Sequence, residues 1–428
     1  MRIHEAEPVD PGSETVPSDM SDASAGPIGT ALTRIGTALR RRDFRWWFGS
    51  QVISASGSMT QNVALSWLVL QDTRNAFWLS ALTVCAWGPV LLLGAWAGAL
   101  VDRMDRRRLL LVTQSLLLAS GLTLGLVNSV GALRIWVILG MSLLAGCVTA
   151  VDSTARQVFV VDLVGRSALA SAVGLWEVAL NASRVLGPGI GGALLATTGP
   201  TACFLVNGLA YLPALFVLRR MVPQPEPGHD VPAGPPKEPG AIRSGIRYAW
   251  RSPLLRACLP LATASGMLFA MSVPLPVLAT RSLHLGGGGY GALLAAFGLG
   301  ALPGALLAAG TATPTGRRVR VLGLATAGSV LLAAWSPLLA LNFAGMALAG
   351  FTSIWFIASA NTLVQLRTLP QMRGRVMGLW GICMSGTLPA TSFLVSGVGQ
   401  TLGARSGFSV SGVALALCCL LGWRGLRE

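Results

Sequence analysis

Charged residues are scarce in this chain. Only 11% of its 428 residues are Asp, Glu, Lys or Arg, whereas a soluble domain usually carries about 25%. Hydrophobic residues make up 53% of the sequence, which is more apolar surface than one water-soluble core can hold. The composition therefore excludes an ordinary soluble domain and predicts an integral membrane protein.

Lysine and acidic residues are the scarcest charged types. Lys237 is the single lysine among 32 basic residues, and 17 acidic residues leave a net charge of +15. Such a charge can indicate nucleic-acid binding. Here, however, the basic residues cluster in alternate gaps between apolar runs, which is typical of membrane orientation and predicts no nucleic-acid partner.

Metal-ligating and catalytic patterns are also missing. The three histidines fall in expected tails or loops, and the seven cysteines lie inside apolar runs without a Cys-x-x-Cys pair. Gly187-x-Gly189-x-x-Gly192 matches a dinucleotide fingerprint, but no strand precedes it. The dinucleotide motif needs that strand. We therefore expect no metal, no cofactor and no enzyme.

What the sequence has in abundance is long apolar runs. Each is close to the roughly 20 residues that a helix needs to cross a bilayer. The predicted spans are residues 46–71, 78–100, 109–128, 133–152, 168–196, 201–218, 255–280, 290–311, 319–335, 337–361, 376–400 and 407–423.

The basic residues predict the orientation of these spans. If the N-terminus is cytoplasmic, the outer loops hold only Arg74, Arg134, Arg281 and Arg405. That bias predicts both termini in the cytoplasm of a multi-pass cell-membrane protein. The predicted organisation is a disordered cytoplasmic tail (1–42), a six-helix bundle (43–220), a Pro-rich and basic cytoplasmic linker (221–253), a second six-helix bundle (254–423) and a short tail (424–428).

The two predicted bundles resemble each other in sequence. Gly94 to Arg108 aligns with Gly304 to Arg318, and Val173-Gly-Leu-Trp176 matches Met377-Gly-Leu-Trp380. Both matches fall at the spacing that a duplicated six-helix unit requires.

The loop after the second span carries the most specific motif. Its pattern, Gly-x-x-x-Asp-Arg-x-x-Arg-Arg, resembles the loop between helices two and three of major facilitator superfamily transporters. The resemblance implies an all-α fold of twelve transmembrane helices in two pseudo-symmetric bundles, and a gating latch in which Gly98 permits close helix packing. Asp105 departs from the family pattern by adding a charge. A bare positive-inside anchor is the alternative. The latch residues and their expected partners are Gly98, Asp102, Arg103, Arg106, Arg107, Asp152 at the end of the fourth span, Arg373 and Arg375.

The fifth span resembles the antiporter motif of drug exporters. Ser183 stands where that motif has Gly, and Pro188 removes a backbone donor and bends the helix. The resemblance favours export by antiport; generic small-residue packing is the alternative. The motif residues are Gly174, Ser183, Gly187, Pro188, Gly191 and Gly192.

Glu177 is the candidate for proton coupling. It lies inside an apolar span, with Asn181 and Arg184 on the same helix face. Burial favours its protonated form while a nearby arginine favours the carboxylate, so protonation can follow conformation. The alternative is a purely structural pair of Glu177 with Arg184.

Other polar and aromatic residues are candidates for the substrate cavity. The superfamily lines its cavity with helices one, four, seven and ten, and by that resemblance Asn62, Trp67 and Asn361 meet substrate; Asn181 joins them from the fifth span. Interhelical hydrogen bonding or interfacial anchoring is the alternative. Few charged residues are available, so we expect an apolar or amphipathic substrate.

Two further stretches narrow the resemblance. Asp152 to Val164 and Leu366 to Met377 are similar to the branch that contains the enterobactin exporter and macrolide efflux proteins. The resemblance spans about residues 43 to 423. It implies a monomeric secondary transporter that exports a small amphipathic compound (a drug, antibiotic or siderophore) in exchange for protons by alternating access. An uncoupled facilitator, or a membrane sensor or scaffold that transports nothing, are the alternatives.

Overall fold

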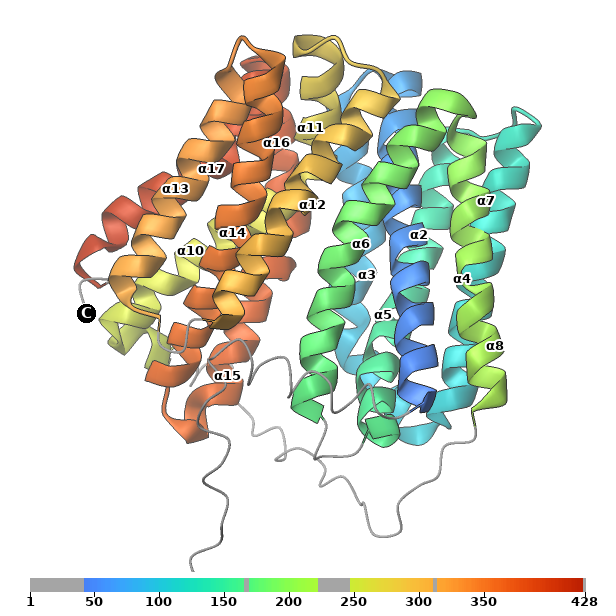
Figure 1. Cartoon of the computed structure of the whole chain (residues 1–428), viewed down its shortest axis with the longest axis horizontal. Helices are drawn as coiled ribbons and strands as arrows, with labels where there is room; N and C mark the ends of the chain where they lie inside the picture. Colours follow the sequence, from blue (N-terminus) through green and yellow to red (C-terminus); the bar gives the residue numbers. More distant parts are fainter. Residues whose placement is uncertain (1–41, 165–168, 222–246, 311–313, 426–428) are drawn as a thin grey trace, which may run out of the picture.

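The structure is a computed structural model that describes residues 42–164, 169–221, 247–310 and 314–425. Within these ranges the regular elements are all helical. The helices form two groups that stand side by side, residues 42–221 and residues 247–425 (Figure 1). All but the last residue of the predicted tail (1–42) and most of the linker of residues 221–253 lie outside the described ranges.

The first group is built from long helices joined by short turns. Pro213 near the start of α8 separates α8 from α7, because proline cannot donate the backbone hydrogen bond that would continue the preceding helix. Its helices are α2 (Arg42–Thr73), α3 (Ala76–Arg103), α4 (Arg106–Ser129), α5 (Ile135–Val164), α6 (Leu169–Thr197), α7 (Pro200–Ala210) and α8 (Leu212–Arg220).

The second group contains two interrupted helices. The spans 255–280 and 376–400 were predicted as single helices, but both are interrupted. A 3-10 turn at Ala270–Ser272 and a π turn at Leu278–Ser282 flank Pro274 and Pro276 in the first, and a π turn at Ile382–Gly386 precedes Pro389 in the second. Membrane helices tolerate such breaks when local adjustments satisfy the freed backbone groups. The elements are α10 (Pro253–Phe269), η1 (Ala270–Ser272), α11 (Pro274–Val277), η2 (Leu278–Ser282), α12 (Gly287–Gly310), α13 (Gly316–Trp335), α14 (Leu339–Arg367), α15 (Pro370–Gly381), η3 (Ile382–Gly386), α16 (Leu388–Thr401), α17 (Ala404–Leu421) and η4 (Gly422–Arg424).

Ten segments among the described residues are long and apolar enough to cross a membrane. The helices α2 and α6 are not among the ten, although they are 32 and 29 residues long. At 1.5 Å per residue, either helix exceeds the roughly 30 Å thickness of the hydrocarbon core. Both helices are thus long enough to cross the bilayer but are not among the ten apolar segments, so the predicted count of twelve spans stays a prediction.

The fourth span is longer than expected. It was predicted to end at Asp152, but α5 continues to Val164. Ala155, Phe159 and Val164 are buried along this extension and join the core formed with Trp47. Their spacing of four and five residues keeps one apolar face on the bundle core, which sustains the helix beyond Asp152.

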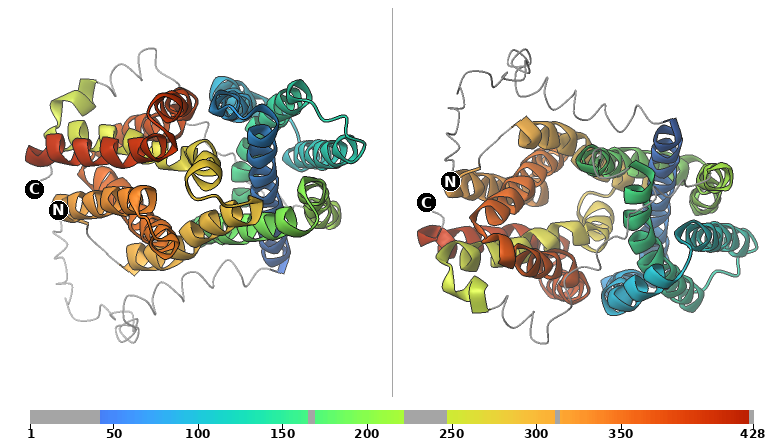
Figure 2. Two further views of the ribbon diagram at one scale, coloured as in Figure 1. Left: turned by 90° about the horizontal axis from the view of Figure 1, so that it is seen from above. Right: turned by 90° about the horizontal axis from the view of Figure 1, so that it is seen from below.

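The two groups touch along two pairs of helices. A Cβ added at Gly192 in α6 would lie 2.8 Å from the Gly291 Cα in α12, so the two backbones are in direct contact there. The Ser80 hydroxyl in α3 donates to the Ser392 carbonyl in α16 at 2.8 Å. Seen from above, α12 runs beside α6, and α11 lies toward α2 (Figure 2).

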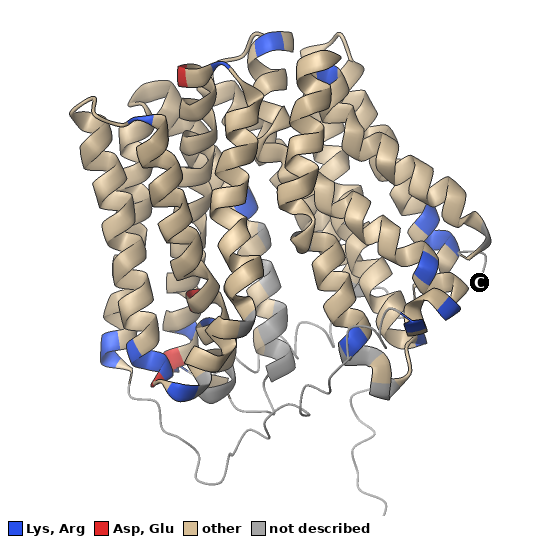
Figure 3. Ribbon diagram, turned by 180° about the vertical axis from the view of Figure 1, so that it is seen from behind, with Lys and Arg blue, Asp and Glu red and all other residues tan. Residues whose placement is uncertain are grey.

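Basic residues gather at one end of the molecule, the end at which α3, α8 and α15 meet the connecting segments (Figure 3). Arg74, Arg134, Arg281 and Arg405 belong to turns or helix ends at the opposite end. This distribution follows the pattern from which the cytoplasmic orientation of the termini is predicted.

Candidate functional site

The first helix group encloses a cavity of about 730 Å³. Its lining comes from every helix from α2 to α7, together with Tyr211. Trp47, Trp87 and Trp176 supply broad apolar surfaces, and serine, asparagine and glutamine side chains are interspersed among them. Ligand pockets for small organic molecules have this size and this mixed lining.

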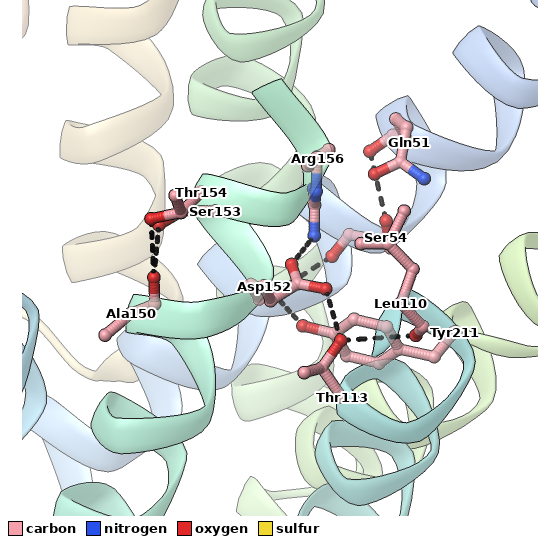
Figure 4. Close-up of polar contacts among 11 residues, drawn as sticks. Gln51, Ser54, Leu110, Thr113, Ala150, Asp152, Ser153, Thr154, Arg156 and Tyr211 are labelled. Atoms are coloured by element: carbon pink, nitrogen blue, oxygen red, sulfur yellow. Dashed lines mark hydrogen bonds and ion pairs between the residues drawn. The ribbon is translucent and has the colours of Figure 1, made fainter. Parts of the chain in front are cut away.

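Asp152 is the charged centre of the cavity wall. Its residue is only 2% exposed, and Oδ1 accepts a hydrogen bond from the Thr113 hydroxyl in α4 at 2.9 Å. Oδ2 forms an ion pair with the guanidinium of Arg156, one helical turn further along α5. Figure 4 shows the carboxylate held between these two partners. Burial of a carboxylate is costly unless it is paired and hydrogen-bonded in this way.

Arg156 has a second partner. Its guanidinium lies 5.5 Å from the ring centre of Trp176 in α6. The Trp176 ring lies in turn 6.3 Å from the Trp47 ring in α2. A guanidinium over an indole face is attracted by the electron-rich ring, so α6 contributes a second contact to Arg156.

Uncharged hydrogen bonds complete the polar wall. The hydroxyls of Ser58 and Tyr211 lie 2.9 Å apart, and the Asn207 amide donates to Gln61 at 2.7 Å. Figure 4 places the Tyr211 ring beside Asp152. These bonds join α2 to α7 and to the start of α8 at the depth of the charged pair.

Asp152 therefore lies elsewhere than the sequence predicted. It was expected at a helix end, facing the loop of residues 98–108, but it is buried inside α5 with partners from α4 and α5. Sequence reasoning missed the Asp152–Arg156 pair. The available signal was two opposite charges four residues apart within an apolar run.

Arg107 is tied to its own helix group. Its Nε donates to the Leu218 carbonyl and its Nη2 to the Arg219 carbonyl, both at 2.6 Å. A cation at these final carbonyls of α8 satisfies acceptors that the helix leaves without partners. In this structure Arg107 therefore fastens α4 to α8 within one group.

The surroundings of Gly98 are open in this structure. A Cβ at this position would meet no heavy atom of the described residues within 4 Å, so the close packing expected at Gly98 stays a prediction. Arg103 is exposed and Arg106 is half-buried. The side chains of Asp102 and Arg373 lie outside what the structure describes, while Arg375 donates to the Met372 sulfur at 3.8 Å.

The acidic side chain of Asp105, which departs from the family pattern, has a structural role as a helix cap. It is the N-cap of α4, and its carboxylate accepts from the Arg108 backbone N–H at 2.7 Å. In the second copy of the repeat, the Thr315 hydroxyl accepts from the Arg318 N–H at 3.3 Å as the N-cap of α13. The aligned positions of the two halves thus perform the same capping task with different side chains.

The small residues of α6 pack against helices of both groups. The Ser183 hydroxyl contacts the Ser56 hydroxyl at 3.3 Å, and the Gly187 carbonyl accepts from Thr60 at 2.9 Å, both in α2. Gly192 faces α12 on the other side. Pro188 and Gly191 are buried in the same segment; nothing at Gly174 is described beyond its place in α6. The motif thus produces close helix packing.

Arg184 reaches from the first group to the second. Its guanidinium lies 4.9 Å from the ring centre of Phe269 in α10. The side chains of Glu177 and Asn181 lie outside what the structure describes. The predicted Glu177 site can therefore be placed only on the backbone of α6.

The predicted cavity residues lie in different places. Asn62 lines the cavity. Trp67 is buried and stacks on Tyr290 of α12, with ring centres 6.4 Å apart, so it packs between the groups and is absent from the lining. The Asn361 amide oxygen accepts from Gln365 within α14 at 3.0 Å, outside the cavity lining.

The turn between α2 and α3 fastens the two groups at one end. The guanidinium of Arg281 donates to the Arg74 carbonyl, and the Gln400 amide donates to Asn75 Oδ1, both at 2.6 Å. Phe77 and Phe393 lie beside this pair of bonds, with ring centres 5.5 Å apart.

Comparison with known proteins finds a matching family model and several similar transporters. The family model described as a transmembrane secretion effector matches residues 36–426. The multidrug efflux pump Tap of Mycolicibacterium fortuitum is 28% identical over 86% of this chain and 91% of its own length. The enterobactin exporter EntS of Shigella flexneri is 27% identical over 82% of this chain and 84% of its own length.

A shorter match and two solved structures extend the comparison. The staphyloferrin A transporter of Staphylococcus aureus is 32% identical over 40% of this chain and 44% of its own length. A bacterial homologue of the lysosomal transporter Spinster, inward-facing and unoccupied, has a TM-score of 0.66 at 13% identity, covering 90% of this chain and 97% of its own. An inward-facing bacterial homologue of the iron transporter ferroportin has a TM-score of 0.66 at 16% identity, covering 93% and 100%. At these identities the two structures establish the fold.

Proposed function

Because this chain belongs to the transmembrane secretion effector family of major facilitator transporters, we propose that it exports a small amphipathic compound across the cytoplasmic membrane in exchange for protons. The cavity of about 730 Å³ in the first helix group carries this proposal. Relatives named as a multidrug efflux pump and as an enterobactin exporter match most of the chain. Both names favour an organic cargo and outward transport.

The lining of the cavity favours an amphipathic cargo. Three tryptophans offer flat apolar faces, and Asn62 and Ser54 offer hydrogen bonds. The charges of Asp152 and Arg156 offset each other across their ion pair. An aromatic or heterocyclic compound with a few polar groups matches such a surface better than a small, strongly charged ion does.

The contacts between the groups support alternating access. The fastening formed by Arg281 and Gln400 on the α2–α3 turn lies at one end of the molecule. If the termini are cytoplasmic, that end is the outer face and the structure is closed to the outside. We infer that the bundles of residues 43–220 and 254–423 rock against each other, and that these bonds break when cargo leaves.

The latch of residues 98–107 then acts at the opposite, cytoplasmic end. Arg107 is bonded within its own group in this structure, as befits a state in which the latch is open on that side. We infer that Arg103, Arg106 and Arg375 contact the opposite bundle when the cytoplasmic side closes.

Inside-out membrane vesicles test the function. Ethidium and rhodamine 6G serve as amphipathic probes, and an ionophore that exchanges protons for potassium collapses the pH gradient. A proton-coupled exporter accumulates a probe only while the gradient stands. A facilitator equilibrates the probe with or without the gradient, and a sensor or scaffold gives no flux above that of vesicles lacking the protein.

A further inference from the structure

Asp152 differs from the other acidic side chains that the structure describes. Asp43, Asp72 and Asp105 are exposed, whereas Asp152 is buried and still lines the cavity. It is therefore held away from bulk water and yet reachable through the cavity. A carboxylate in that position is a place where one proton can be bound and kept.

The Thr113 hydroxyl can serve Asp152 in either protonation state. Thr113 Oγ1 lies 2.9 Å from Asp152 Oδ1 and 3.2 Å from the Leu110 carbonyl oxygen. A hydroxyl both donates and accepts. With Asp152 ionised, Thr113 donates to the carboxylate; with Asp152 protonated, the carboxyl donates to Thr113, which then donates to Leu110.

Arg156 has a second stabilising contact that remains when its ion pair is lost. Its side chain is 14% exposed, and its guanidinium lies 5.5 Å from the centre of the Trp176 ring. Its Nε has no hydrogen-bond partner in this structure. A guanidinium beside an aromatic ring keeps a cation–π interaction when the neighbouring carboxylate becomes neutral.

Asp152 is the one acidic side chain among the described residues that line the cavity. From α2 the cavity wall presents Ser54 and Ser58, which are uncharged. Tyr211 shares its hydroxyl with Ser58 and is the other titratable group beside the pair. Arg156 is the cation that faces Asp152, and α6 contributes Trp176.

We propose that Asp152 is the group that binds the exchanged proton, with Arg156 and Thr113 as its positioning residues. Protonation at Oδ1, where the carboxyl then donates to Thr113, neutralises the partner of Arg156 and leaves the guanidinium with its contact to Trp176. Loss of the proton on the other side of the membrane restores the ion pair between α5 positions 152 and 156. This assignment rests on the proposed proton-coupled export and names the site at which the proton is carried.

Infrared difference spectroscopy tests the assignment without any cargo. The purified full-length protein in lipid is stepped from acid to alkaline pH, and the difference spectrum detects any carboxyl group that changes its protonation state. We expect a protonated-carboxyl band in the wild type that disappears in Asp152→Asn. The same band remains in Asp72→Asn, the matched control on an exposed acid at the end of α2.

A second variant keeps the test decisive if Asp152→Asn does not fold. Thr113→Val retains the carboxyl but removes its hydrogen-bond partner, so the band should persist at a shifted frequency. Three results overturn the assignment: no such band in the wild type, a band that persists unchanged in Asp152→Asn or Thr113→Val, or a band lost in Glu177→Gln and retained in Asp152→Asn.

The vesicle assay separates failure of this assignment from failure of the proposed function. If wild-type probe flux ignores the pH gradient, the coupling itself is wrong, whatever the spectrum shows. If wild-type flux requires the gradient and Asp152→Asn flux still requires it, the coupling stands and the Asp152 assignment is wrong. The expected result is gradient-dependent flux in the wild type, and in Asp152→Asn at most downhill flux that the gradient no longer changes.

Discussion

The Gln400 amide at the end of α16 donates to the Asn75 side chain at the start of α3, at 2.6 Å and across 325 residues of sequence. Asn75 Oδ1 also accepts from the Phe77 backbone N–H at 2.9 Å as the N-cap of α3. One amide oxygen therefore caps a helix of the first group and also accepts a hydrogen bond from the second group. Local helix formation and contact between the groups depend on the same atom.

Gln400→Ala should loosen this fastening. A hydrogen bond contributes about 1 kcal/mol, so local opening of the α2–α3 turn should become about fivefold more frequent. Hydrogen–deuterium exchange of residues 73–77 measures the change. Gln365→Ala is the matched control, because Gln365 donates to Asn361 within a single helix; equal exchange rates at the turn in both variants would contradict the fastening.

Gly192→Ala should disrupt the contact between α6 and α12. The new Cβ would lie 2.8 Å from the Gly291 Cα, and backbone cannot move aside without separating the helices. We expect a lower melting temperature and loss of probe flux. Gly189→Ala is the control in the same helix, since its Cβ would lie 4.0 Å from Ala295, an ordinary contact. If Gly189→Ala loses as much probe flux as Gly192→Ala, the contact of Gly192 with α12 is not what transport depends on.

Arg107→Ala should destabilise the first helix group. It removes two charge-assisted hydrogen bonds to α8 carbonyls, each of which contributes about 1.5 to 3 kcal/mol. Thermal unfolding in detergent measures the loss. Arg108→Ala should cost much less, because the contact of Arg108 with Asp105 uses its backbone N–H, which the substitution leaves in place. An equal fall in melting temperature in the two variants would show that positive charge at this end, and not the two hydrogen bonds, stabilises the first helix group.

Asp105→Ala and Thr315→Ala should cost similar stability. Each removes the side-chain cap of a helix start, α4 in one case and α13 in the other, and loss of such a cap costs about 0.5 to 2 kcal/mol. Asp105→Ser should restore most of the loss, because serine also caps. If Asp105→Ser melts like Asp105→Ala, the negative charge of Asp105 has a role beyond capping.

Much of the architecture could be predicted from the sequence because membrane burial acts on each segment separately. The scarcity of charge and the length of the apolar runs predicted the helices, and the resemblance of the loop after the second span to a known motif pointed to the family. Helix ends were predicted less well: α5 continues past Asp152 because Ala155, Phe159 and Val164 keep an apolar face on the bundle core, and Arg156 in the next turn neutralises the charge of Asp152. The breaks before α11 and α16 were missed because prolines inside apolar spans do not reveal which of them interrupt the helix.

The geometry of the candidate site could be predicted only to a small extent. Asn62 lines the cavity, whereas Trp67 packs on Tyr290 between the groups, and contact of either residue with substrate stays a prediction. Both lie on α2, and which face of that helix meets the cavity depends on how neighbouring helices pack around it. The spacing of residues along α2 cannot decide that, because polar and apolar residues occur on all sides of the helix.

The sequence by itself determined that this chain is a helical membrane protein of the major facilitator kind, because hydropathy, the placement of arginines and short motifs are properties of single segments. Only the tertiary structure decided that Asp152 is a buried, paired carboxylate on a cavity wall, and that Arg107 holds α8. Those facts depend on which helices lie beside α4 and α5. The partners Leu218 and Trp176 are brought to them from other helices by packing that no local pattern specifies.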